Sequence, residues 1–181
     1  MQDMELVAKI EALGAAHAGI VNVADIHFDP AFRELCVSNA CGNYGKCWMC
    51  PPDAGDIHEL IARAKTFDKA LVYQTIGTLE DSYDFEGMME AADVHNQLAR
   101  KALAEFSALP FQKHLHLGAG GCHQCPVCAK RTNEPCRFPE KAMASLETYG
   151  VAVSELAVQA KMNYINGQDT VTYFSAFLYT E

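Results

Sequence analysis

Apolar residues recur at helical spacing in several stretches of the chain. In residues 3–17, Leu6, Ile10, Leu13 and His17 fall on one stripe, which predicts an amphipathic helix. Two further helices are predicted before residue 82: a short one that begins at Asp29-Pro30 and carries Cys36, and one that begins at Asp56, with Glu59 completing its cap. Residues 82–107 form the next predicted helix. The last two run from Pro139 to about Tyr149, ending at a left-handed Gly150, and over residues 154–162, capped by Ser154.

The longest helical pattern spans residues 82–107 and has a continuous apolar stripe. His95 falls on this stripe, so we interpret it as a core histidine with satisfied hydrogen bonds. The other residues predicted to face inward are Phe85, Met88, Met89, Ala92, Ala99, Leu103 and Phe106.

Runs of β-branched and aromatic residues predict strands over residues 19–28, 70–78, 112–117 and 170–180. The last run is apolar on both faces, which indicates an interior strand. Because helices and strands alternate, we predict an α/β fold, a single-domain sandwich of about four strands formed by residues 1–181.

Composition indicates an ordinary globular protein, because half of the 181 residues are apolar and a fifth are charged. No apolar run approaches the roughly 20 residues that span a bilayer. The N-terminus lacks the basic start and the apolar stretch of a secretory signal. We therefore expect a cytoplasmic protein with no membrane partner.

The net charge of −9 makes nucleic acid an unfavourable partner, because phosphates repel an acidic surface. An acidic surface also suits docking to a basic patch on a redox partner protein. Most acidic proteins are simply well solvated, and the oligomeric state is not readable from the sequence.

Eight cysteines form two groups, separated by a long stretch without any. They define two cysteine-rich loops, at about residues 36–52 and 118–139. If the first and third strands ran in the same direction, both loops would lie at one edge of the sheet. A reducing compartment disfavours a disulfide framework, so metal binding is the leading interpretation. The groups are Cys36, Cys41, Cys47 and Cys50, and Cys122, Cys125, Cys128 and Cys136.

In the second group, Cys122, Cys125 and Cys128 follow one another at two-residue gaps, and Cys136 precedes Arg-Phe-Pro139. This run matches the first three ligands of a bacterial-type iron–sulfur loop. Zinc sites usually take their cysteines in pairs from two separate loops, so zinc is the alternative. His123 lies inside the run but is more often a bystander than a ligand.

In the first group, the end Cys50-Pro51 resembles the end of a ferredoxin-type run. Cys47-Trp-Met-Cys50 alone also suits a dithiol redox pair, but Pro51-Pro52 blocks the helix that should follow, and two cysteines would stay unexplained. We predict that Tyr44 and Trp48 cover a cluster and exclude water. Lys46 would offset the cluster's charge or hold an anionic ligand, although loop lysines are usually solvated.

Four thiolates fill all corners of a [4Fe–4S] cluster and leave no iron open for substrate. We therefore predict an iron–sulfur protein, with two [4Fe–4S] clusters, that acts in electron transfer. The alternatives are a zinc-stabilised binding module and an iron–sulfur enzyme with one open-site cluster. No independent catalytic motif appears. His114 and His116 alternate on a strand and are expected to be surface histidines.

The stretches CGNYGKCWMCPP at 41–52, the triple run that follows Gly121, and CRFPEK from Cys136 resemble a family of predicted metal-binding proteins known as domain of unknown function 2284. The likeness extends from about Cys36 to the terminal strand. It implies a cysteine-rich protein of anaerobes that binds metal or iron–sulfur clusters, with no reaction attached. Cys47 departs from the family pattern. If it is not a ligand, three cysteines remain in the first group, and one corner is open for another donor or a substrate.

Overall fold

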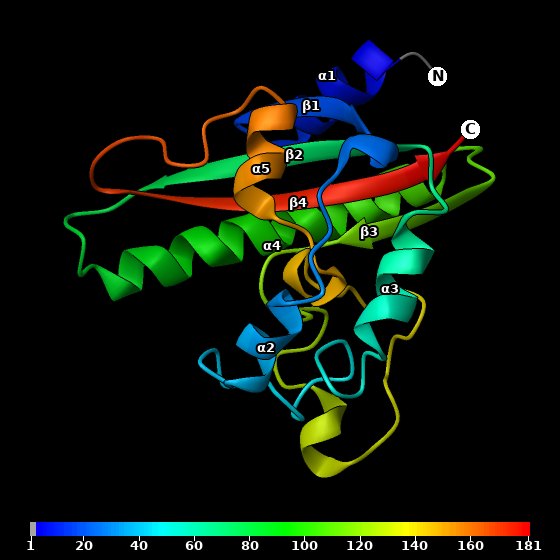
Figure 1. Ribbon diagram of the computed structural model, residues 1–181. Helices are drawn as coiled ribbons and strands as arrows, with labels where there is room; N and C mark the ends of the chain where they lie inside the picture. Colours follow the sequence, from blue (N-terminus) through cyan, green and yellow to red (C-terminus); the bar gives the residue numbers. More distant parts are fainter. Residues whose placement is uncertain (1–2) are drawn as a thin grey trace.

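The computed structural model describes residues 3–181, and at its centre is an antiparallel sheet in the order β1-β2-β4-β3 (Figure 1). The strands are β1 (His17–Asn22), β2 (Lys69–Thr78), β3 (Lys113–Leu117) and β4 (Thr170–Thr180). β4 pairs with β2 on one side and with β3 on the other, which confirms the predicted interior strand. The first strand is shorter than predicted, because Val23–Asp25 forms a 3-10 turn.

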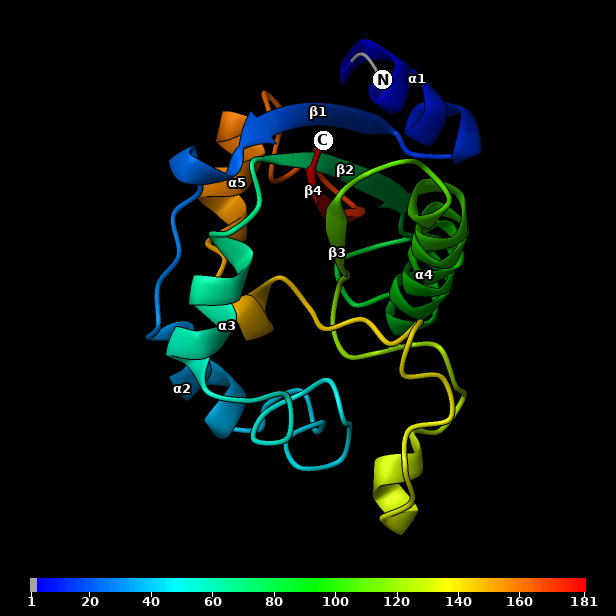
Figure 2. The ribbon, with the colours of Figure 1, turned by 90° about the vertical axis from the view of Figure 1, so that its right-hand side faces the viewer.

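Helices cover both faces of the sheet, as the α/β sandwich prediction requires (Figure 2). α1 (Asp3–Leu13) and α4 (Phe85–Ser107) lie on one face. α3 (Ile57–Ala64) and α5 (Val153–Gln159) lie on the other. Within residues 3–181, no helix combines the length and the apolar character that crossing a bilayer requires.

The side chains of β2 alternate between the two layers, as in any strand. Leu71 and Tyr73 pack in the core with α1 and α4, whereas Ala70 and Val72 pack in the core with α3 and α5. Both faces are therefore buried, which is why the central strands are apolar without alternation.

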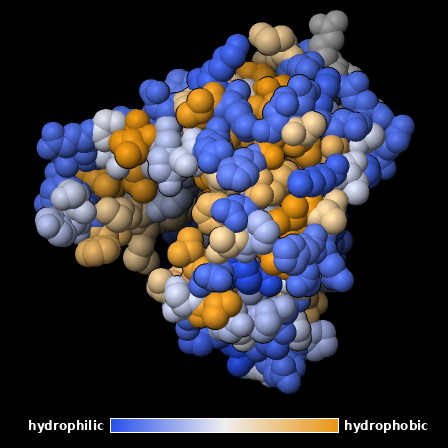
Figure 3. Space-filling view, viewed as in Figure 1, coloured by the Kyte–Doolittle hydropathy of each residue, from blue (hydrophilic) through white to orange (hydrophobic). Residues whose placement is uncertain are grey.

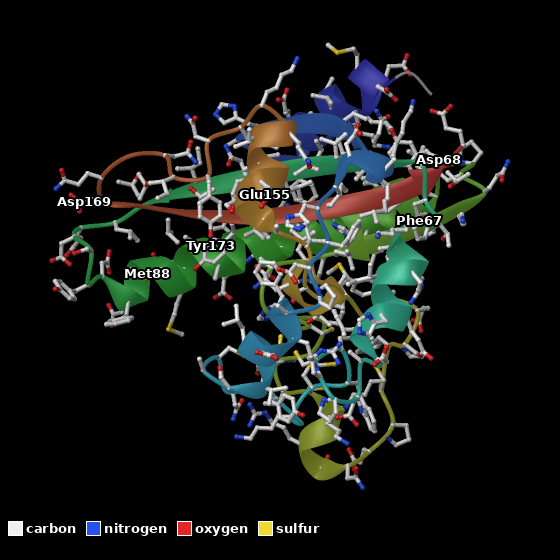
Figure 4. All side chains as sticks on the ribbon, in the orientation of Figure 1. Phe67, Asp68, Met88, Glu155, Asp169 and Tyr173 are labelled. Carbon is white, nitrogen blue, oxygen red and sulfur yellow. The ribbon has the colours of Figure 1, made fainter. Side chains whose placement is uncertain are left out.

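α4 runs beyond the apolar layer that it covers. The hydroxyl of Tyr173 on β4 donates to the carbonyl of Met88 at 3.0 Å, which holds the helix onto the sheet (Figure 4). Phe85 and Met89 are nevertheless 71% and 70% exposed, so their predicted inward orientation is wrong. Apolar surface is visible in the projecting lobe at the left of Figure 3, where α4 begins. Deeper in the helix, Ala99 and Phe106 are buried as predicted.

Most helix ends fall near their predicted positions. Asp56 caps α3, and its carboxylate accepts from the backbone N–H groups of His58 at 2.9 Å and Glu59 at 3.3 Å. α1 stops at Leu13 rather than at His17, because Gly14 has a φ of +126° that a helix does not tolerate. α5 begins after Ala152, so Ser154 lies inside the helix and does not cap it.

The helix predicted from Pro139 to about Tyr149 is wrong over most of its length. Gly118 N–H donates to the carbonyl of Ala144 at 2.8 Å, and Leu146 N–H donates to the carbonyl of Gly118 at 3.0 Å. This extended pairing next to β3 uses backbone groups that a helix would need. Only the 3-10 turn η3 (Glu147–Tyr149) remains, and it ends at a left-handed Gly150 as predicted.

Both cysteine loops lie below the sheet (Figures 1 and 2), and residues of both line one cavity. β1 and β3 run in opposite directions, because β1 and β4 both pair antiparallel to β2, and β3 pairs antiparallel to β4. The loops meet by another route. Asp29 N–H donates to the carbonyl of Gly150 at 2.7 Å and Ala152 N–H to the carbonyl of His27 at 3.1 Å. This pairing leads the chain down to α2 (Phe32–Val37), which carries Cys36 as predicted.

Candidate metal centre

Three cysteines of the first loop, Cys36, Cys41 and Cys50, line one cavity of about 260 Å³, and we call these three residues the first site. α2 supplies Cys36, and the turns that follow supply the other two. The cavity is large enough for a group of several atoms rather than for a single ion.

The opposite wall of this cavity comes from distant parts of the chain. The glycines before Cys122 contribute Gly120 and Gly121, and the η3 region contributes Ser145, Glu147 and Thr148. A side chain at Gly121 would crowd the site, because its Cβ would lie 3.5 Å from Cys50 Sγ and 3.3 Å from Asn43 Nδ2. Sequence reasoning missed the η3 residues, because no motif connects them to the cysteines.

The other five cysteines line a second cavity and form the second site. Cys47 lies here, away from the quartet in which the sequence places it. This cavity measures about 20 Å³, roughly the room of one water molecule. The members of the second site are Cys47, Cys122, Cys125, Cys128 and Cys136.

The two sites touch at the turn that contains Cys47 and Cys50. Both residues are buried, with 4% and 7% exposure, and their thiols are hydrogen-bonded to each other. The shared hydrogen bond lowers the pKa of Cys47 and raises the pKa of Cys50. Cys47 also accepts a hydrogen bond from the backbone of Cys122, which ties it to the second site.

All eight cysteines are free thiols. Burial raises the pKa of Cys36 and of Cys122, which disfavours the bare thiolate in each case. Binding of a metal would deprotonate these thiols and release protons. The affinity of either site for its metal should therefore increase as the pH rises.

The three residues predicted to contact a cofactor are placed differently from one another. Tyr44 lines the first cavity, and Trp48 lines the second. The indole Nε1 of Trp48 donates to the carbonyl of Glu134 at 2.9 Å, and Lys130 Nζ lies 4.3 Å from the ring centroid. Lys46 is exposed and lines neither cavity.

The histidines take structural positions. Thr75 Oγ1 lies 2.8 Å from His95 Nδ1, and Ser175 Oγ lies 2.7 Å from its Nε2, so the prediction of a satisfied core histidine is confirmed. His116 is buried, so its predicted surface position is wrong. The hydroxyl of Tyr73 lies 2.8 Å from its Nε2 and is hydrogen-bonded to it. His114 is exposed as predicted.

Two residues beside the cysteines have buried donor atoms without a partner among the described residues. The Nε and Nη2 atoms of Arg33 are buried without a hydrogen bond, close enough to Cys36 to lower the pKa of its thiol. Gln124 lines the second cavity, and its Nε2 is also buried and unpartnered. Buried donors normally find an acceptor. An anionic, sulfur-rich group at the second site would supply one for Gln124, and the positive charge of Arg33 near Cys36 suits such a group at the first site. Arg33 lies one helical turn before Cys36, which the sequence could have signalled.

Zinc ions and iron–sulfur clusters require different spacings between their sulfur ligands. Among residues 3–181, no group of three or more His, Cys, Asp or Glu side chains is arranged to hold one ion. A zinc site needs four ligands converging within about 2.3 Å of one point. Each thiolate of a [4Fe–4S] cluster binds a different iron, so its sulfurs stand further apart.

Comparison with known proteins gives one match. A family model described as "Predicted metal-binding protein (DUF2284)" matches residues 19–179, a span that contains both sites. No curated protein and no solved structure matches the chain. Metal binding is the property that the family description and the cysteine geometry have in common.

Proposed function

We propose, from the premise that the chain belongs to the DUF2284 family of predicted metal-binding proteins, that its cysteines hold two iron–sulfur clusters and that it acts in electron transfer. The carrying observation is the contact between the two sites. Cys47 of the second site and Cys50 of the first lie in one turn, where Cys50 N–H donates to the carbonyl of Cys47 at 3.1 Å, so groups held at the two sites would be neighbours.

A [4Fe–4S] cluster, when bound, accepts and gives back single electrons at a potential tuned by its charge and hydrogen bonds. The residues of this chain would do the tuning. Arg33 places a positive charge near Cys36, and Tyr44 and Trp48 shield the two cavities from water. Lys130 Nζ pairs with a carboxylate oxygen of Asp53 at 2.9 Å, which joins the second loop to the end of the first.

We also propose that the electrons pass to or from a partner protein, in the cytoplasm. Free thiols in this number persist only where the compartment is reducing. The net charge of −9 favours a partner with a basic docking surface.

A second candidate concerns the second site alone. Its cavity of about 20 Å³ has room for one ion, and a cluster would require the loops to move apart. Four of its five thiolates drawn together would suit a closed structural zinc site. The protein would then carry one cluster at the first site and one zinc at the second.

The test is metal and sulfide analysis of the full chain purified without oxygen, with absorption and electron paramagnetic resonance spectra before and after dithionite. Two clusters give about eight irons and eight sulfides per chain, with reduced-state signals broadened by magnetic coupling between neighbours. About four irons with one zinc would select the second candidate. Protein that holds zinc alone, or no metal, would overturn both.

A further inference from the structure

The first site has three thiols for a cluster that has four irons. Cys36, Cys41 and Cys50 line its cavity, and the thiol that would complete the quartet, Cys47, lies among the second site's cysteines. No cysteine of the second loop lines the first cavity either. One corner of a cluster bound here would therefore lack a thiolate.

One carboxylate lines this cavity. Glu147 is the only Asp or Glu among the described residues that line the first cavity. It interacts electrostatically with Cys36, because η3 packs beside α2. Its side chain stays accessible from the cavity, although the surrounding protein displaces enough water to raise the pKa of its carboxyl group.

The backbone fixes the position of Glu147. On its N-terminal side, residues 144–146 pair with Gly118, and on its C-terminal side Gly150 pairs with Asp29. The hydroxyl of Ser145 is hydrogen-bonded to the Glu147 carboxylate. Ser145 is itself held, because its Oγ accepts from Thr148 N–H at 3.1 Å and lies 2.9 Å from Thr148 Oγ1. The carboxylate is thus oriented by supporting hydrogen bonds, as metal-binding carboxylates usually are.

We propose that Glu147 supplies the fourth ligand of the first site, through a carboxylate oxygen, beside the thiolates of Cys36, Cys41 and Cys50. This inference rests on the proposed function, because it requires a cluster at the first site. A hard oxygen donor holds an iron of a cluster less firmly than a soft thiolate does. The iron at Glu147 is therefore the exchangeable one, and the cavity of about 260 Å³ gives a small ligand access to it.

The experiment compares the wild-type protein with Glu147→Gln, Glu147→Cys and the control Glu140→Gln. Glu140 is an exposed glutamate that lines neither cavity. Each protein is loaded with iron and sulfide, and mild oxidation with ferricyanide is followed by electron paramagnetic resonance. When a [4Fe–4S]²⁺ cluster loses one Fe²⁺ and gives one electron to ferricyanide, a paramagnetic [3Fe–4S]⁺ cluster remains.

We expect wild type and Glu140→Gln to lose one iron per chain at the same rate. Glu147→Gln should lose it about ten-fold faster and Glu147→Cys about ten-fold more slowly. Mössbauer spectra of the loaded proteins give a second readout. A subsite with an oxygen ligand should be present in wild type and replaced by a thiolate-bound subsite in Glu147→Cys.

Equal rates and unchanged Mössbauer subsites in both Glu147 variants, with clusters present, would overturn the role of Glu147 and leave the proposed function intact. Absence of any cluster from the first site of the wild type would instead remove the proposed function. Circular dichroism confirms that each variant is folded before it is loaded.

Discussion

Cys47 and Cys50 lie in one turn, with Trp48 and Met49 between them, and their thiols are hydrogen-bonded. They nevertheless line different cavities. The turn directs the side chains of Cys47 and Cys50 into different cavities, so closeness in the sequence does not decide which thiols act together. The interpretation of these residues as a dithiol redox pair also loses support, because each thiol has other cysteines around it.

Serine substitutions test this division. Cys50→Ser leaves the first site with two thiols, and we expect it to lose about half of the bound iron. Cys47→Ser leaves four thiols at the second site and three at the first, so we expect nearly full iron content. Iron analysis after identical loading measures both. Loss of the first-site signal in Cys47→Ser would contradict the division.

Arg33 provides a second residue-level prediction. Its positive charge near Cys36 stabilises negative charge at the first site. Arg33→Gln should make reduction of the first-site group harder, lowering its potential by tens of millivolts. Redox titration monitored by paramagnetic resonance measures the shift. The exposed Arg131 gives the control, since Arg131→Gln should leave this potential unchanged.

At the scale of elements, α4 is attached to the sheet through buried polar groups as well as apolar ones. His95 of α4 is hydrogen-bonded to Thr75 of β2 and to Ser175 of β4. Within the sheet, Tyr73 of β2 is hydrogen-bonded to the buried His116 of β3. Burial lowers the pKa of His95 to about 4 and that of His116 to about 3. Both imidazoles therefore stay neutral in the folded protein at moderately acidic pH.

The free energy of unfolding should consequently fall as the pH falls below about 6.5. The unfolded chain binds protons at these histidines from that pH downward, whereas the folded protein does not bind them until its lower pKa values are reached. Between pH 7 and pH 5 we expect a loss of about 1–2 kcal/mol per histidine. Urea unfolding of His95→Gln should show a shallower pH dependence than wild type. The exposed His58→Gln should keep the wild-type slope, and an unchanged slope in His95→Gln would refute this account.

Gly150 controls how η3 meets the segment that leads to α2. Its φ is +72°, and a Cβ there would lie 2.9 Å from the carbonyl oxygen of Asp29. Gly42 has a similar φ of +77°, but a Cβ at Gly42 would meet nothing within 4 Å. The Gly42→Ala variant therefore measures the free-energy cost of the positive φ alone. We expect Gly150→Ala to lower the free energy of unfolding by about 1–3 kcal/mol more than Gly42→Ala. Equal losses in chemical denaturation would show that the close approach is unimportant.

At the scale of the whole molecule, the sheet and its helices have two apolar cores of their own, whereas the cysteine loops lie below them (Figure 2). The second site's cysteines are mostly only half-buried. The loops therefore depend more on their ligands than the sheet does.

Removal of the bound metal should thus act locally. We expect faster amide hydrogen exchange in residues 36–52 and 118–139 of the stripped protein, with the four strands still protected. Mass spectrometry of exchange in loaded and stripped protein measures this. Loss of protection throughout the sheet on stripping would show instead that the metal holds the entire fold together.

The sequence by itself determined the elements that depend on local patterns. Strand β4 was predictable as interior because its residues are apolar on both faces, and α3 because Asp56 caps an amphipathic run. The sequence also identifies the eight cysteines as candidate metal ligands, because thiols at this close spacing have few other uses where disulfides do not form. Composition and local periodicity carry this information without reference to distant residues.

Only the tertiary structure decided how these residues are shared between sites. The pairing of Gly118 with Ala144 and Leu146 replaced a predicted helix, and it brought Glu147 to a cavity lined by cysteines from a distant part of the chain. Cys47 lines the second cavity because the turn at residues 47–50 directs its side chain there. Neither outcome has a local sequence signal, because long-range backbone pairing and the packing of two loops are set by parts of the chain that a local pattern does not include.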